Sequence, residues 1–266
     1  MSDGDAWPGL DTAVPHSARI WNYWLGGTDN FAADREAGEE FLSAYPLQRD
    51  KARACRGFLA RAVRHLVTEA GVRQFLDVGS GLPTADNTHE VAQRLAPEAR
   101  IVYVDDDPLV LAHARGLLTG SPQGATRYLD ADMHDPETIL AQAATVLDLD
   151  RPVALLMIGV LGHVADHGEA CSIVRRLLAG LAPGSYLVET DGTDASPAYL
   201  AAIERYRDSG GVPYHARTHA QIAAFYAGLE LVEPGVVPIH RWRPERAATE
   251  TSPDVSESGG VGRKSG

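Results

Sequence analysis

The stretch that decides the fold runs from Gln74 to Gln93 and reads QFLDVGSGLPTADNTHEVAQ. An apolar run rich in β-forming residues, QFLDV, ends at the turn Gly79-Ser80-Gly81, and a segment with helical character follows. Two glycines at such a place let the backbone turn tightly and approach a ligand that larger side chains would exclude. A Gly-x-Gly turn alone is weakly specific, because many strand–helix joints contain one.

The residues after this turn narrow the kind of ligand. The third glycine of a dinucleotide fingerprint would fall at position 84, which is Thr84, and Pro83 before it has no amide hydrogen to offer a pyrophosphate. The helix begins later, with Asn87 as its cap and Glu90 at the spacing of a capping box. The turn is therefore poorly equipped for phosphate and suits a ligand with a neutral ribose and an amino-acid tail.

Further short apolar runs alternate with helical segments after this turn. The other runs expected to form buried strands cover 100–105, 126–131, 153–159 and 184–190. The expected helices cover 87–95, 108–118, 136–146, 169–182, 197–207 and 218–227, and two late runs, LELV and VVPIH, follow. Such alternation predicts an α/β fold with a doubly wound, mostly parallel sheet and a ligand at the carboxyl ends of its strands.

The chain divides into four parts by composition. Residues 15–71 form a helical extension, or lid, with expected helices from Ser17 to the Gly26–Gly27 pair, over 31–44 and over 49–70. Residues 72–243 carry the strand–helix alternation of a Rossmann-like domain. Residues 1–14 and 244–266 are poor in large apolar side chains, so both ends are predicted to be disordered.

Three consecutive carboxylates, Asp105, Asp106 and Asp107, close the second strand. Asp107 precedes Pro108 and is an ordinary helix cap, whereas Asp105 can accept both hydroxyls of a ribose. Asp106 contacts either the adenosine or solvent. Three acidic side chains also favour a cationic ligand such as a sulfonium.

Another acidic residue, Asp132, follows the third strand and is succeeded by Met133. Asp132 is placed to accept a hydrogen bond from an adenine amino group, with Met133 against the ring. The alternative is that acids near Asp135-Pro136 support the dipole of the next helix. In company with the two earlier motifs, Asp132 is the better candidate for the ligand.

These motifs resemble a methyltransferase family described as S-adenosyl methyltransferase, or as a domain of unknown function. The resemblance covers about residues 15–243 and rests on six stretches: HSARIWNYWLGGTDNFAADRE, QFLDVGSGLPTADNTHEVAQ, VYVDDDPLVLAHAR, YLDADMHDP, LAPGSYLVE and FYAGLELVEPGVVPIHRWRP. It implies a class I fold with a seven-stranded sheet and S-adenosylmethionine as cofactor. By similarity, Asp77, Gly79 and Gly81 surround the methionine portion, Asp105 holds the ribose, and Asp132 and Met133 flank the adenine.

The chain departs from the family pattern at two places. Family members usually carry tyrosine–aspartate–tyrosine where this chain has Trp21-Asn22-Tyr23, and an asparagine–arginine pair where it has Cys55-Arg56. Both departures fall in the amino-terminal extension, and the cofactor turn is unchanged.

Residues beyond the fourth and fifth strands indicate where an acceptor binds: Gly159 to His163, and Glu189 to Asp191. His163 is the candidate general base, and a structural role for this histidine is equally open. His163 and His167 have the i, i+4 spacing of a metal pair, but no third ligand is near in sequence, so we predict no metal.

Three residues of the first helices, Arg19, Tyr23 and Asn30, are candidates for substrate or lid contacts. An aromatic stripe at helical spacing fits core packing as well as a lid.

Composition limits the partners. The net charge of −12 disfavours DNA or RNA, which leaves a small-molecule substrate. No apolar run is long enough to span a bilayer and no signal peptide is visible at the start, so we expect no membrane partner and a cytoplasmic protein.

The sequence thus predicts an S-adenosylmethionine-dependent methyltransferase with an unidentified acceptor. A non-catalytic S-adenosylmethionine-binding sensor would share the cofactor residues and differ in lacking a substrate-sized cavity beside the methyl group. A nucleotide-dependent oxidoreductase is disfavoured by Pro83 and Thr84.

Overall fold

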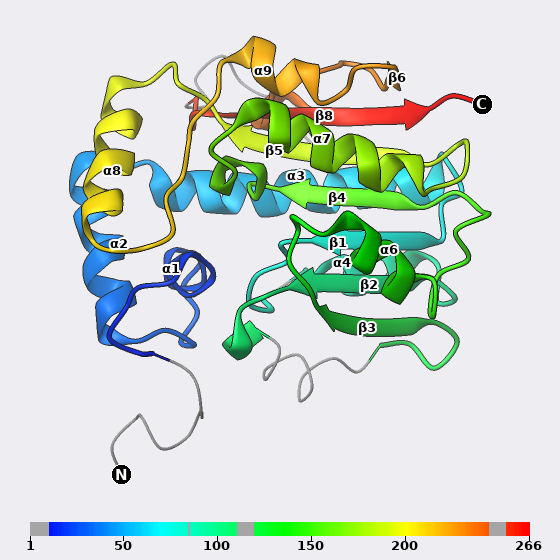
Figure 1. Cartoon of the computed structure of the whole chain (residues 1–266), viewed down its shortest axis with the longest axis horizontal. Helices are drawn as coiled ribbons and strands as arrows, with labels where there is room; N and C mark the ends of the chain where they lie inside the picture. Colours follow the sequence, from blue (N-terminus) through cyan, green and yellow to red (C-terminus); the bar gives the residue numbers. More distant parts are fainter. Residues whose placement is uncertain (1–10, 85, 111–119, 245–253) are drawn as a thin grey trace.

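A computed structural model of the chain describes residues 11–84, 86–110, 120–244 and 254–266 (Figure 1). Its strands belong to a single sheet. They are β1 (Gln74–Val78), β2 (Arg100–Asp105), β3 (Ala125–Asp130), β4 (Ala154–Ile158), β5 (Tyr186–Gly192), β6 (Leu229–Leu231), β7 (Val237–Pro238) and β8 (Glu257–Lys264).

The strand order is β3-β2-β1-β4-β5-β8-β6, and the short β7 pairs with β8. The first five strands run parallel, while β8 is antiparallel to both β5 and β6. The order reverses between β1 and β4, which creates the crevice where ligands of doubly wound sheets bind. The predicted mostly parallel α/β sheet is confirmed, with seven strands along this path and β7 as an addition.

The helices fall close to the predicted segments. They are α1 (Ser17–Trp24), α2 (Ala32–Ala44), α3 (Gln48–Thr68), α4 (Thr88–Leu95), α6 (Pro136–Ala143), α7 (His167–Ala179), α8 (Pro197–Asp208) and α9 (His219–Ala224), with short 3-10 helices η2 (Leu161–His163) and η3 (Ile239–Arg241). The predicted cap of α4 is confirmed, since Asn87 and Glu90 form a capping box. Of the helix predicted over 108–118, residues 111–118 lie outside the described residues.

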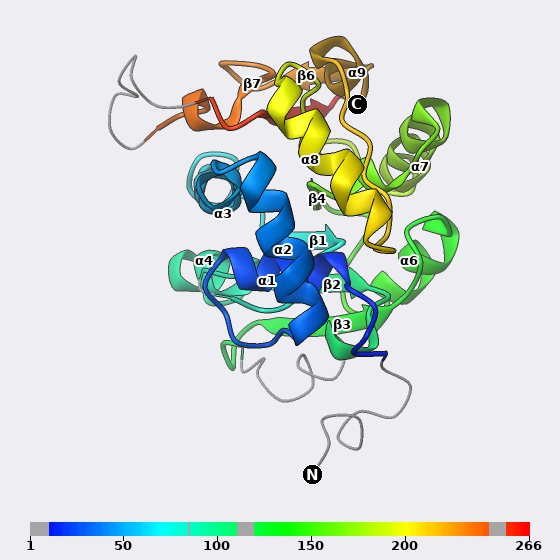
Figure 2. The same cartoon turned by 90° about the vertical axis from the view of Figure 1, so that its left-hand side faces the viewer.

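Helices cover both faces of the sheet, as Figure 2 shows with α3 and α4 on one side and α6 and α7 on the other. Side chains of alternate strand positions, such as Phe75 and Leu76, enter opposite cores. Both are fully buried, which explains why the strands read as continuous apolar runs.

The predicted amino-terminal helices are present and lie at the carboxyl ends of the parallel strands. In Figures 1 and 2, α1 and α2 stand with α8 in front of this edge of the sheet. They share a separate core in which Trp24, Phe41 and Tyr199 pack with ring centroids 5.1 Å and 6.0 Å apart. This packing holds α1, α2 and α8 together at the carboxyl ends of the parallel strands.

The prediction of a disordered tail over 244–266 is wrong for its last part. Residues 257–264 form β8, which lies between β5 and β6 in the interior of the sheet. Its glycines are required by close approach, because a Cβ at Gly259 would lie 2.2 Å from the Glu189 carbonyl oxygen. The low apolar content that indicates disorder here reflects glycine positions at which neighbouring residues leave no room for a Cβ. Residues 245–253 lie outside the described residues.

The other predicted disordered end, residues 1–14, lies outside the described part of the chain up to residue 10. The carbonyls of Asp11 and Val14 accept hydrogen bonds from Arg19 of α1. Among the helices that the structure describes, none has both the length and the apolar character needed to cross a membrane.

Candidate functional site

A cavity of about 330 Å³ opens at the carboxyl ends of β1, β2 and β4. All eight residues predicted to bind the cofactor or act as base lie in its lining: Asp77, Gly79, Gly81, Asp105, Asp106, Asp132, Met133 and His163. They come from four separate strand–helix connections, so the parallel sheet brings them together as expected.

The glycine turn has the conformation that its composition requires. Gly79 and Gly81 have φ values of +72° and +64°, in the left-handed region that favours glycine. A Cβ at Gly79 would also lie 2.3 Å from Val160 Cγ2, so a side chain there would collide with the connection after β4. The turn therefore depends on glycine for its backbone shape at both positions and for space at Gly79.

Asp105 joins the tip of β2 to this turn. Its Oδ2 accepts a hydrogen bond from the Gly81 amide at 2.8 Å, and its Oδ1 accepts one from the Asp107 amide at 3.1 Å. Burial raises the pKa of Asp105 to about 6. Each carboxylate oxygen keeps a second lone pair, so the side chain is oriented by the protein and still able to accept from a ligand.

Asp77 occupies the end of β1 and is 5% exposed. Its Oδ2 accepts a hydrogen bond from Thr88 Oγ1 at 2.6 Å, and burial raises its pKa to about 6. Thr88 is the first residue of α4, so this contact ties the helix to the strand beneath the glycine turn.

The third predicted site lies on the far wall of the cavity, after β3. Asp132 is exposed, and its Oδ1 accepts a hydrogen bond from the His134 amide at 2.8 Å. Met133 packs against the core on the Leu76 face of the sheet. Asp132, Met133 and His134 all line the cavity. Asp135 caps α6 through the Thr138 amide, so the residue that opens this helix is not the residue that faces the cavity.

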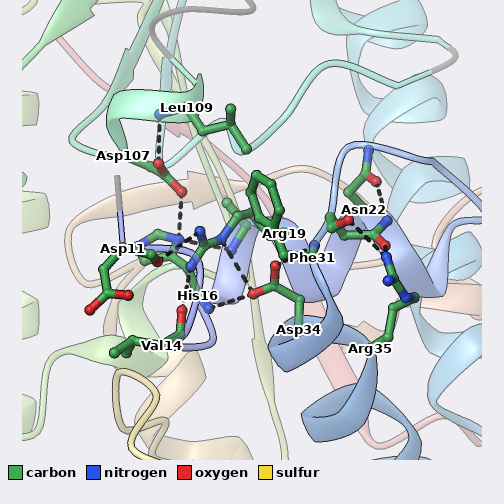
Figure 3. A network of polar contacts seen from close by, with 12 residues as sticks. Asp11, Val14, His16, Arg19, Asn22, Phe31, Asp34, Arg35, Asp107 and Leu109 are labelled. Atoms are coloured by element: carbon green, nitrogen blue, oxygen red, sulfur yellow. Dashed lines mark hydrogen bonds and ion pairs between the residues drawn. The ribbon is translucent and has the colours of Figure 1, made fainter. Parts of the chain in front are cut away.

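The amino-terminal helix α1 lies across the cavity, on the side away from the strand ends. Ser17, Ala18, Trp21 and Leu25 line it, so this helix and its carboxyl-terminal cap form part of the cavity wall. His16, immediately before α1, also lines it, and its Nδ1 lies 2.7 Å from Asp107 Oδ2 (Figure 3).

His16 was missed in the sequence, although its contact links the lid to the second strand–helix connection. Burial alone would lower the pKa of His16, but the hydrogen bond and charge of Asp107 raise it above the ordinary value. The two residues form an ion pair when His16 is protonated, and this pair holds the start of α1 against the cavity edge.

The three lid candidates do not line either cavity described here. Arg19 is 3% exposed and pairs with Asp34 at 3.3 Å (Figure 3). Asn30 donates to Asn22 Oδ1 at 2.9 Å. Tyr23 points to the surface, where it hydrogen-bonds Glu39. Their contacts join α1 to α2 and to the loop between these helices.

A smaller cavity of about 70 Å³ adjoins the larger one. Ser17, Trp21, Gly159 and His163 line both. His163 lies in η2, and its Nδ1 is 3.0 Å from the Pro213 carbonyl oxygen. Since a carbonyl oxygen only accepts, Nδ1 carries the proton and Nε2 of the neutral ring keeps its lone pair. Burial lowers the pKa of His163, so the ring is neutral at pH 7.

Two charged residues of the smaller cavity, Lys51 and Glu257, were also missed in the sequence. Lys51 looks like part of a basic helix surface, and Glu257 lies in the segment predicted to be disordered. Of the predicted acceptor-side residues, Glu189 and Asp191 line neither cavity, and Asp191 instead pairs with Arg217 at 3.0 Å. Within the described ranges, no group of three or more His, Cys, Asp or Glu side chains could hold a metal ion.

Comparison with known structures identifies two similar proteins. A DUF574 family protein from Streptomyces avermitilis MA-4680 is 46% identical with a TM-score of 0.91, covering 96% of this chain and 99% of that chain. A methyltransferase candidate from Thermobifida fusca YX is 40% identical with a TM-score of 0.90, covering 97% of this chain and 98% of that chain.

More distant structures share the fold alone. The plantazolicin methyltransferase BpumL, solved with a triazolic desmethylPZN analog and S-adenosylhomocysteine, has a TM-score of 0.53 at 11% identity, covering 94% of this chain and 96% of that chain. A search of the curated proteins found no significant match. The family model described as S-adenosyl methyltransferase matches residues 4–265. Because this match spans nearly the whole chain and the cavity has the expected residues, the protein belongs to the S-adenosyl methyltransferase family: it is a methyltransferase, and its cofactor is S-adenosylmethionine.

Proposed function

We propose that this enzyme methylates a small molecule held between α1 and the tip of β4, with the cofactor in the larger cavity. One observation carries the proposal: the predicted cofactor residues line one cavity, and a second cavity opens beside it through Gly159 and His163. A sensor that only bound the cofactor would have no use for this second space.

The residues of the larger cavity fit S-adenosylmethionine. Thr84 Oγ1 is buried and has no hydrogen-bond partner within the described residues, so it offers a contact to a ligand. Pro83 supplies no amide for a phosphate, and the cofactor carries none. Asp105 would hold the two ribose hydroxyls, and Asp77 with the glycine turn would surround the methionine portion.

The adenine would lie on the side of the cavity formed after β3. Met133 offers an apolar and polarisable surface for the ring, and Asp132 offers an acceptor for its amino group. Since Asp132 already accepts from the His134 amide, its carboxylate is oriented before the ligand arrives.

When bound, S-adenosylmethionine supplies a methyl group on a sulfonium: the acceptor's lone pair forms the new bond to carbon, and the carbon–sulfur pair stays on sulfur. Three cavity carboxylates, Asp77, Asp105 and Asp106, provide negative charge that favours binding of a cationic ligand.

His163 is the residue that we propose as general base. Its Nε2 keeps a lone pair because the Pro213 carbonyl fixes the proton on Nδ1. For an acceptor with an O–H or N–H nucleophile, Nε2 takes that proton as the methyl group is transferred. The lowered pKa of His163 keeps the ring unprotonated and ready at neutral pH.

The lid positions the reactants and excludes water. Trp21 lines both cavities, so one side chain of α1 contacts the cofactor space and the acceptor space. Closing such a site can supply much of the rate acceleration, because methyl transfer requires the two reacting atoms to be in line.

The net charge of −12 supports a small-molecule substrate over a nucleic acid. We also place the enzyme in the cytoplasm, an inference supported by the free thiols of Cys55 and Cys171.

A product screen tests the proposal. The purified protein is incubated with S-adenosylmethionine carrying a trideuterated methyl group and with small-molecule extracts of cells, and products bearing the label are sought by mass spectrometry. We expect a labelled small molecule that is absent without the protein. A protein that binds S-adenosylhomocysteine but labels nothing in extracts of its own host would favour the sensor function.

A further inference from the structure

The smaller cavity has mainly aromatic walls. Trp24, Phe41 and Tyr199 line it together with Tyr206 and Tyr214. Phe41 and Tyr199 belong to α2 and α8, so the cavity extends from the cofactor site into the core of the amino-terminal extension. A flat ring fits such walls better than a flexible polar chain does.

A buried ion pair lies in this aromatic surrounding. Glu257 is 1% exposed, and its Oε2 lies 2.9 Å from Lys51 Nζ. Lys51 Nζ also donates to the Ser256 carbonyl at 3.1 Å and lies 3.7 Å from the centre of the Tyr199 ring. Lys51 is thus fully engaged, and the charges of the pair cancel.

The second oxygen of Glu257 is left over. Among the described residues no N–H or O–H group donates to Oε1, which is inaccessible to bulk water, and the buried Cys55 thiol offers Glu257 only a weak S–H donor. A Cβ built on Gly159 would lie 4.0 Å from this oxygen. Since Gly159 lines both cavities, Oε1 faces the place where they meet.

Two other polar atoms of the smaller cavity are also unused. Gln48 Oε1 and the Tyr206 hydroxyl are buried and lack a partner among the residues that the structure describes. Buried polar atoms are normally hydrogen-bonded, so three unpartnered atoms around one cavity indicate a ligand with complementary groups. Two of the three, Glu257 Oε1 and Gln48 Oε1, only accept, so the ligand must donate.

We infer that Glu257 binds the methyl acceptor, and that the acceptor is a small uncharged aromatic molecule carrying one polar group, a hydroxyl or N–H, apart from the group that is methylated. The inference rests on the proposed function, because it places the acceptor beside the cofactor cavity. The aromatic walls hold the ring, Glu257 Oε1 accepts a hydrogen bond from the polar group, and Lys51 keeps the carboxylate charge balanced. A cationic acceptor is disfavoured because Lys51 already neutralises Glu257.

Two probes of nearly equal shape test this inference. p-Cresol and p-xylene differ by a hydroxyl in place of a methyl group, and both are titrated by proton NMR into the full chain saturated with S-adenosylhomocysteine. A hydrogen bond to a charged group corresponds to roughly tenfold to hundredfold in affinity, so p-cresol should bind that much more tightly. Glu257→Gln should lower the ratio of the two affinities by several-fold, because a neutral amide oxygen accepts a weaker hydrogen bond than a carboxylate does.

The matched control is Glu189→Gln, since Glu189 is equally buried and lines neither cavity. This variant should keep the preference for p-cresol. Glu257→Gln leaves Lys51 buried without its partner, which destabilises a fold. The double variant Lys51→Met/Glu257→Gln removes both charges, and it should show the same lowered preference while melting as one folded species.

The outcomes separate the two proposals. A parent protein that bound no S-adenosylhomocysteine would overturn the proposed function and this inference with it. A parent that bound S-adenosylhomocysteine but showed equal affinity for p-cresol and p-xylene would overturn this inference alone. An unchanged preference in the folded Glu257 variants would do the same.

Discussion

Substitution of Asp105 by asparagine tests the centre of the cofactor site. The change keeps the size of the side chain and removes its charge. In the parent, the carboxylate accepts hydrogen bonds from the amides of Gly81 and Asp107 at 2.8 Å and 3.1 Å. An asparagine can accept from only one of these amides, since its second terminal atom is a donor.

The size of the effect follows from the lost contacts. A hydrogen bond to an ionised group is worth about 1.5–3 kcal/mol, and the variant loses at least one such contact to a ribose hydroxyl. The dissociation constant for S-adenosylhomocysteine should therefore rise by roughly tenfold to hundredfold. Burial raises the pKa of Asp105 to about 6, so the comparison is made at pH 8, where the parent carboxylate is ionised.

Isothermal titration calorimetry measures the two affinities, and the matched control is Asp130→Asn. Asp130 pairs in register with Asp105 at the end of β3 but is exposed and lies outside both cavities. The control should bind like the parent, and circular dichroism confirms that each variant is folded. Equal affinity of parent and folded Asp105→Asn would refute the placement of the ribose on Asp105.

Three further outcomes are expected. His163→Asn should lower turnover of an O–H or N–H acceptor by about a hundredfold, with cofactor affinity within about twofold of the parent by calorimetry; an unchanged rate would leave His163 a structural role. The pKa values of Asp77 and Asp105 are raised to about 6, so both gain protons as the pH falls through 6. Since the ligand prefers ionised acceptors, the affinity for S-adenosylhomocysteine should fall about tenfold between pH 8 and 5. An affinity that stays constant over this range would contradict the placement of these two carboxylates. Deletion of residues 257–266 should abolish folding, as judged by soluble expression and circular dichroism. The deletion removes the strand that pairs with seven β5 residues, and it leaves Lys51 buried without Glu257. A soluble product that melts cooperatively would show that β8 is dispensable.

The local sequence was sufficient to predict features that depend on a single strand or helix. The apolar run before Gly79 forms β1, and Asn87 with Glu90 caps α4 as predicted. The grouping of Asp77, Asp105 and Asp132 also followed, because carboxyl ends of neighbouring parallel strands meet at one edge of a sheet.

Polar side chains of the lid were less predictable. Arg19 and Asn30 can bind a ligand or a neighbouring backbone with equal ease, and their use depends on how α1 meets α2. In the structure Arg19 pairs with buried Asp34, and Asn30 bonds Asn22. No pattern within the first helix indicates that Trp21, and not Tyr23, faces the cavity.

The amino-acid sequence by itself determined the order of strands and helices, the glycine turn and the carboxylates that follow it, because each depends on residues close together in the chain. Only the tertiary structure decided the place of β8 and Glu257. The segment SESGGVGRK has the composition of a linker, and it forms a buried strand because Gly259 and Gly262 let β5 and β6 lie where a Cβ would collide. That approach brings residue 257 against Lys51, some two hundred positions earlier, a pairing that no local pattern records.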